Sequence, residues 1–254
     1  MASGGLRAKL ARLMQVAGVD GCKSGWLVVR GSTPPLRYLR SHVFATFAEV
    51  VEYTKQYAAV GVDIPIGLSD DDRRLPDIEA RTVLRPRRHN SVFPAPLRPV
   101  LGIRDYRKAC AISAHAHKYN KKLSKQTHAL LPKIEEVDDL MDEATQGRLF
   151  EVHPEVCFWA MNGCEAMAEK KTSRVGEAGR ARLLSREFST NVLSNFQDFR
   201  SELAQNERRG VALNDFLDAC AAACTAARFA RGEARTLPEN PSIDSRGLRM
   251  EIVY

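Results

Sequence analysis

The sequence predicts an α/β fold, in which a mixed sheet is flanked by helices and carries a largely helical basic insertion. Short apolar runs typical of buried strands alternate with segments whose apolar residues recur at helical spacing. Two of the runs end on the same tripeptide, Gly-Val-Asp, at 18–20 and at 61–63. In α/β sheets the functional groups lie at the ends of strands. We therefore expect Asp20 and Asp63 to mark a site at one edge of the sheet.

The composition is that of a globular protein with a substantial core. The 254 residues are 44% hydrophobic and 27% charged, and no apolar stretch approaches the roughly 18 residues of a membrane span. We therefore expect no membrane partner. The six cysteines contain no C-x-x-C pair, which argues against a zinc ribbon and a thioredoxin-like site. Their pattern fits a reducing compartment, so we expect a cytoplasmic protein.

The positive charge is concentrated in one segment. Residues 73–133 contain 15 basic and 3 acidic residues, so the rest of the chain is net negative although the whole carries +7. This asymmetry is typical of a surface that binds nucleic acid or another phosphate-bearing polyanion, although a solvated basic face would give the same count. The candidate phosphate contacts, chosen by charge and loop position, are Arg81, Arg85, Arg87, Arg88, Lys122, Lys125 and Lys133.

The N-terminal third is expected to be mostly sheet. Residues 1–13 are expected to be a disordered extension, and Met14–Arg30 is expected to form a β-hairpin around a glycine-containing turn. Arg37–Phe44 follows as a third strand. Thr46 is a suitable N-cap for a helix over Phe47–Tyr57, before the buried strand that ends at Asp63.

The middle of the chain has a different character. We interpret residues 70–147 as a basic insertion or cap within a single domain that spans residues 14–254. The four prolines of Arg85–Pro99 indicate a loop of fixed shape. The expected helices of the insertion are Asp77–Val83, Tyr106–Tyr119 and Glu136–Gln146.

The C-terminal third returns to the sheet. Leu149–Glu155 is expected to be a strand that Pro154 ends, with Glu151 and His153 on one face. Its last strand, Leu248–Tyr254, could leave a free sheet edge for pairing with a second copy in a homodimer. Two helices are expected between these strands, over Lys170–Arg186 and, capped by Asn214, over Asp215–Arg231, where six alanines permit close approach to a sheet.

Four aspartates form the main candidate constellation. Asp20 and Asp63 follow strands, whereas Asp215 and Asp218 share a face of a helical first turn. Turn formation would explain Asp20, and the helix dipole would explain the helical pair. Clustered carboxylates are nevertheless costly unless a hard cation such as Mg²⁺ or Mn²⁺ holds them. The four aspartates are thus the predicted ligands of one or two ions, an arrangement that can hydrolyse phosphodiesters.

Nearly the whole chain, from about Met14 onward, resembles a family of predicted nucleases with an RNase H-like fold, catalogued as domain of unknown function four-two-nine. The motifs that carry the resemblance are GVDGCKSGW (18–26), VDIPIGL (62–68), AR (80–81), SVFPAP (91–96), LSKQTHALLPKIEEVD (123–138), EVHPE (151–155), LDAC (217–220), LP (237–238) and GLRMEIVY (247–254).

The resemblance implies roles for particular acids. Asp20 resembles the catalytic aspartate on the first strand of the RNase H-like superfamily, and Asp63 resembles the acid on its fourth strand. Asp215 and Asp218 resemble the closing helix acids of Holliday-junction resolvases. Glu151 is a fifth catalytic candidate. The basic insertion is not part of the minimal RNase H-like core.

Two other functions are compatible with the same features. Actin-like ATPases and sugar kinases also begin with an Asp-Gly hairpin that wraps phosphate, which suggests an ATP-binding phosphotransferase. Such proteins need a second phosphate hairpin, and VDIPIGL (62–68) lacks its glycines. The other alternative is a nucleic-acid-binding module that retained the acids for structural reasons. The sequence favours a metal-dependent nuclease, with Mg²⁺ or Mn²⁺ as cofactor, over both.

Overall fold

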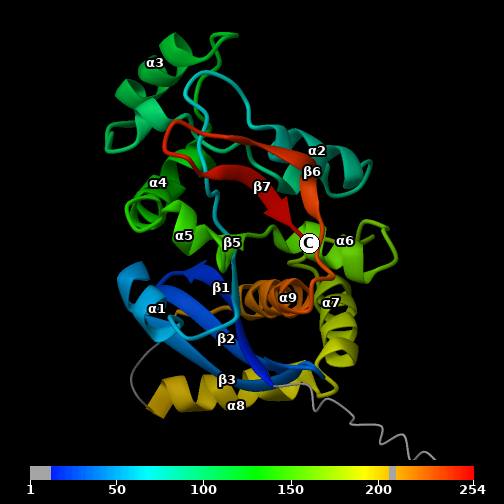
Figure 1. Ribbon diagram of the computed structural model, residues 1–254. Helices are drawn as coiled ribbons and strands as arrows, with labels where there is room; N and C mark the ends of the chain where they lie inside the picture. The colour runs from blue at the N-terminus through cyan, green and yellow to red at the C-terminus, as the bar shows by residue number, and fades with distance from the viewer. Residues whose placement is uncertain (1–12, 206–209) are drawn as a thin grey trace, which may run out of the picture.

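A five-stranded mixed sheet forms the centre of the molecule (Figure 1). The computed structural model describes residues 13–205 and 210–254. The strand order is β3-β2-β1-β4-β5, in which β1, β4 and β5 run parallel and β2 is antiparallel to both of its neighbours. This arrangement confirms the predicted α/β class. The strands are β1 (Met14–Cys22), β2 (Gly25–Thr33), β3 (Arg37–Phe44), β4 (Ala59–Val62) and β5 (Leu149–Glu151).

Helices surround this sheet, and a small second sheet completes the fold. The second sheet pairs β6 (Thr236–Ile243) with β7 (Arg249–Val253). The α-helices of the described residues are α1 (Phe47–Tyr53), α2 (Leu75–Val83), α3 (Tyr106–Ala116), α4 (Lys125–Asp138), α5 (Glu143–Gln146), α6 (Pro154–Met161), α7 (Arg174–Glu187), α8 (Val192–Gln205) and α9 (Leu213–Ala230).

The repeated Gly-Val-Asp tripeptide has a structural explanation. Gly18 of β1 and Gly61 of β4 are direct partners in the parallel register, so they lie side by side. Helix α9 packs on them so closely that a Cβ at Gly18 would collide with the backbone of Ala219 and Ala223, and one at Gly61 would lie 2.9 Å from the Ala222 carbonyl oxygen. The two glycines therefore form the flat surface on which the alanine-rich helix rests.

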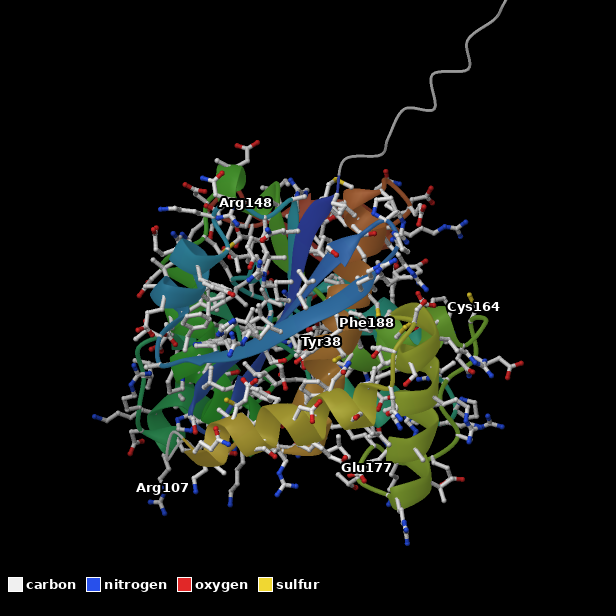
Figure 2. All side chains as sticks on the ribbon, turned by 90° about the horizontal axis from the view of Figure 1, so that it is seen from below. Tyr38, Arg107, Arg148, Cys164, Glu177 and Phe188 are labelled. Carbon is white, nitrogen blue, oxygen red and sulfur yellow. The ribbon has the colours of Figure 1, made fainter. Side chains whose placement is uncertain are left out.

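Both faces of the sheet are buried. One face packs against α9, whose Phe216 also contacts Phe196 of α8 at a ring-centroid distance of 5.2 Å. Figure 2 shows α8 running beside β3 on this side of the molecule. The other face packs against α1 and α4, where Trp26 meets Phe47 and Ile134. Part of the predicted insertion thus belongs to the core of the sheet.

The C-terminal strand pair lies beyond the β5 edge, together with α2 (Figure 1). The expected last strand, Leu248–Tyr254, is present as β7, and one of its edges pairs with β6. In addition, the backbone N–H and C=O of Arg249 are both bonded to the side chain of Gln146, at 2.9 and 2.8 Å. This second sheet therefore serves as a wall of the fold.

The hairpin, the third strand and the Thr46 cap are confirmed, whereas several helix bounds are corrected. Helix α1 ends at Tyr53 instead of Tyr57, because Thr54 forms the C-cap and its hydroxyl bonds the carbonyl of Val50. Helix α3 likewise ends at Ala116.

A larger correction concerns the predicted helix Glu136–Gln146. The chain instead forms α4, which begins after the cap residue Ser124 and continues through Pro132, and then the short α5. Helix α8 was not predicted at all. Within residues 13–205 and 210–254, no helix combines the length and apolarity required to cross a bilayer.

The close packing of α9 on the sheet predicts that Gly18→Ala is strongly destabilising. Gly179→Ala, in a helix with space for a methyl group, serves as the control. Gly18→Ala places a methyl group against helix backbone that cannot move aside, so we expect a loss of roughly 3 kcal/mol or more of stability. Gly179→Ala within α7 meets only the Met167 Cε at 3.5 Å and should be neutral or stabilising by about 0.5–1 kcal/mol. Denaturant unfolding of both variants measures this, and equal stabilities would contradict the proposed packing.

Candidate functional site

The predicted acids at the strand ends do come together. Asp20 lies near the carboxyl end of β1. Asp63 directly follows β4, and its backbone N–H donates to the Val19 carbonyl at 2.9 Å. Both residues line a pocket of about 270 Å³ at the carboxyl ends of the parallel strands. The position fits the general rule that ligands of α/β sheets bind beyond the carboxyl ends of strands.

The carboxylates of Asp20 and Asp63 have no hydrogen-bond or ion-pair partner among the described residues. Asp20 is only 8% exposed. Burial, followed by repulsion from Asp63, raises the pKa of Asp20 well above its ordinary value. Burial and the charge of Asp218 raise the pKa of Asp63 to about 8. The two acids therefore face the pocket as groups that gain from a proton or a bound cation.

Lys171 supplies a positive charge that opposes the rise in the pKa of both acids. Its Nζ lies 2.7 Å from Oδ2 of Asp218, the buried acid in the second turn of α9. Burial alone would lower the pKa of Lys171, but Asp218 outweighs this effect and raises it, with smaller contributions from Asp63 and Asp20. Lys171 therefore stays charged at the boundary between α9 and the pocket, which it also lines.

Glu151 is held in a different way from the two aspartates. Arg74, which is almost fully buried, donates to both Glu151 carboxylate oxygens at 2.7 and 2.9 Å and to Asp77 at 2.9 Å. The backbone N–H of Ile66 donates to Glu151 as well. Burial would lower the pKa of Arg74, but the two acids raise it. Glu151 thus lies in the pocket wall with its oxygens already paired.

A second buried ion pair joins Arg180 to Glu155, two positions after His153. Arg180 donates to Oε1 of Glu155 at 2.6 Å, and both side chains are fully buried. Oε2 of Glu155 and Nδ1 of His153 have no hydrogen-bond partner among the described residues, although both residues line the pocket. The Nε2 of His153 faces the Ser91 carbonyl at 3.4 Å, so Nε2 carries the proton and Nδ1 is an acceptor. Burial lowers the pKa of His153 and keeps the ring neutral.

Asp215 has a capping role in this structure. Its Oδ2 accepts from the backbone N–H of Ala212, and its Oδ1 accepts from the side chain of Asn214. The N-cap of α9 is therefore Ala212, and the expected cap at Asn214 is wrong. Asp215 contributes charge near Asp20 but does not line the pocket.

The seven predicted phosphate contacts do not gather at the pocket. Lys133 alone among them lines it, and there its Nζ is bonded to the Gly25 carbonyl at 2.7 Å. Arg81 and Arg88 donate to backbone carbonyls, of Val92 and of Met167 and Ala168 respectively. The four remaining members, which are exposed, are Arg85, Arg87, Lys122 and Lys125.

Several residues of this site, Lys171, Arg74 and Glu155 among them, were not assigned a role from the sequence. Lys171 stands in a polar loop, and no periodicity or motif distinguishes it from neighbouring lysines. Arg74 was counted only as one of many basic residues. Glu155 was visible within EVHPE, two positions after His153, and this spacing is the one signal that could have identified it.

The fit of the site to a metal ion can be judged from its free oxygens. In the part of the chain that the structure describes, no group of three or more His, Cys, Asp or Glu side chains is arranged to hold a metal ion. Mg²⁺, however, often takes only one or two carboxylates and completes its shell with water and substrate phosphate. Asp20 and Asp63 offer unpaired carboxylates of that kind, so the site fits such an ion, with Asp218 neutralised by Lys171.

Comparison with known proteins identifies the family. A family model described as a protein of unknown function, DUF429, matches residues 18–243, and the chain belongs to that family. No curated protein and no solved structure matches it.

Because Arg74 is buried between two acids, we expect removal of its guanidinium to lower the stability of the protein strongly. Arg74→Met leaves the Glu151 and Asp77 carboxylates buried without a positive charge beside them, which should cost about 3–5 kcal/mol. Arg73→Met, at the exposed neighbouring position, should cost no more than about 0.5 kcal/mol. Urea unfolding of both variants measures the difference, and a small effect at Arg74 would show that the network is not stabilising.

The raised pKa of Asp63 predicts how stability varies with pH. Its folded value of about 8 exceeds the ordinary value of 3.8, so the folded protein binds the additional proton. The stability that this proton contributes to the folded state is complete at low pH and is lost as the pH rises toward the folded pKa of Asp63. Asp63→Asn removes the effect, so in chelator its melting temperature should rise relative to the wild type from about pH 5 to about pH 8. If the melting temperatures of the two proteins changed with pH in the same way, the raised pKa of Asp63 would be contradicted.

Proposed function

We propose that this member of the DUF429 family is a metal-dependent phosphodiester hydrolase, a nuclease in the broad sense, that acts in the pocket at the ends of β1 and β4. The observation that carries the proposal is the pair of unpartnered carboxylates, Asp20 and Asp63, which face this pocket. Their placement at the ends of two parallel neighbouring strands is also what the resemblance to RNase H-like nucleases implies.

Asp20 and Asp63 are the proposed ligands of one or two Mg²⁺ or Mn²⁺ ions. A bound ion of this type would activate water and stabilise the leaving oxygen of a phosphodiester. The acids are well suited to this role because burial raises both pKa values, with added repulsion from Asp63 on Asp20 and from Asp218 on Asp63, and a bound cation would relieve this cost. Asp218 supports the site indirectly by holding Lys171.

The chain's own cations and its histidine complete the proposed machinery. Lys171 and Lys133, which both line the pocket, would attract the phosphate and orient it toward the two aspartates. The neutral His153 also lines the pocket, where the Ser91 carbonyl holds its Nε2 edge, and it would help to position the groups beside it. Glu151 and Arg74 keep the pocket wall in place.

The decisive test is calorimetric titration of Mn²⁺ into the wild type and into Asp20→Asn. We expect the wild type to bind one or two ions and Asp20→Asn to lose most of that heat, because the variant lacks one of the two free carboxylates. Asp70→Asn, at an exposed acid outside the pocket, should bind as the wild type does.

Hydrolysis of a small chromogenic phosphodiester in Mn²⁺ should then fall to background in Asp20→Asn and Asp63→Asn, with the circular dichroism spectrum unchanged. If the wild type bound no ion, the acids would be structural and the hydrolase proposal would fail.

A further inference from the structure

Ser91–Phe93 line the pocket, and several residues fix the segment Ser91–Pro96 that contains them, which we call the roof. Arg81 of α2 donates to the Val92 carbonyl at 2.6 Å, and Asp77 accepts the Ala95 N–H at 2.8 Å. Thr127 of α4 donates to the Pro94 carbonyl at 3.1 Å. Since Asp77 is itself held by the buried Arg74, the roof is tied to the sheet as well as to both flanking helices.

The neighbouring wall is equally fixed. Lys133 of α4 bonds the Gly25 carbonyl, and its Nζ also lies 4.3 Å from the centre of the Trp26 ring. The indole nitrogen of Trp26 donates in turn to Glu136, one turn further along α4. The helix that carries Leu130 into the pocket is therefore attached directly to the β1–β2 hairpin. A ligand has to fit the space that these contacts define.

The pocket lining also includes an apolar area. We call the end of the pocket at Asp20, Asp63 and Lys171 its floor, where Asp20 is only 8% exposed. Higher in the pocket lie Phe93 and Leu130, which remain 41% and 38% exposed although they are large and apolar. A ligand with its phosphate at the floor would place the group attached to that phosphate against these two side chains.

The size and the charge distribution argue against a duplex as ligand. About 270 Å³ is close to the lower limit of small-molecule pockets, roughly 300 Å³. Duplex binding relies on many phosphate contacts along the backbone. Here Lys133 is the single predicted phosphate contact at the pocket, and Arg81 and Arg88 are bonded to backbone carbonyls.

We propose that the pocket takes a small phosphodiester, with one phosphate and one or two flat apolar substituents, and not the internal phosphodiester of a nucleic-acid duplex. This inference rests on the proposed hydrolase function and specifies its substrate class. In it, the two aspartates and Lys171 face the phosphate, whereas Phe93 and Leu130 cover an aromatic substituent. The geometry of a fixed roof over a charged floor carries the proposal.

The test compares two substrates with the full-length protein in Mn²⁺: bis(p-nitrophenyl) phosphate and a labelled DNA duplex. We expect the small diester to be hydrolysed, the duplex to be left intact, and Asp20→Asn to be inactive. Phe93→Ala and Leu130→Ala should each raise KM for the small diester roughly tenfold, equivalent to about 1.4 kcal/mol of lost contact. Leu140→Ala, which is equally exposed but outside the pocket, is the matched control and should leave KM unchanged.

Binding gives a second readout that does not depend on turnover. Calorimetric titration with p-nitrophenyl phosphate, a product of the small diester, should show weaker binding to Phe93→Ala than to Leu140→Ala.

The outcomes separate the two proposals. Hydrolysis of the duplex, dependent on Asp20 and more efficient than that of the small diester, would overturn the substrate class and leave the hydrolase function intact. A KM that is unchanged in both wall variants would also overturn it. Failure to hydrolyse either substrate, together with an absence of Mn²⁺ binding, would overturn the hydrolase function and this inference with it.

Discussion

The close packing of α9 on the backbone of β1 and β4 is the contact on which the candidate site depends. It is possible because Gly18 and Gly61 are neighbours in the parallel register and present no side chains to the helix. The small residues of α9 then lie directly against the strands, and Asp218 is buried close to the strand ends. A larger residue at Gly18 would displace the helix and with it the ion pair to Lys171.

The acids around the pocket are of two kinds: those that form an ion pair with an arginine and those that do not. Glu151 and Glu155 each receive an arginine, Arg74 and Arg180, and these pairs hold the walls. Within residues 13–205 and 210–254, Asp20 and Asp63 receive no such partner, and they line the open space of the pocket. Since an unpaired buried carboxylate is unfavourable, its persistence in the fold is most simply explained by a role in binding. The proposed hydrolase function follows from this contrast more than from the number of acids.

The correct predictions were those that rest on local patterns. The hairpin, the strand Arg37–Phe44 and the Thr46 cap each depend on residues within a few positions of one another, and their bounds or roles are confirmed. Helix α4 was misjudged because Pro132 and a polar start at Lys125 resemble a loop, although its buried face packs well against the sheet. Asp215 matched the expected spacing with Asp218, but local capping holds its carboxylate away from the pocket.

The sequence by itself indicated the hairpin, the third strand and the strand before Asp63, and it placed Asp20 and Asp63 at one edge of the sheet because both follow the same Gly-Val pair at the end of an apolar run. It did not indicate β6, and the strand expected over Leu149–Glu155 ends at Glu151. Only the tertiary structure decided which acids remain free and what surrounds them. Lys171 reaches Asp218 across 47 positions of the chain, and Arg74 reaches Glu151 across 77. Such pairs have no local periodicity, since they form when packing brings distant loops together. The roof over the pocket arises in the same way, from hydrogen bonds between α2, α4 and the segment that both of them hold.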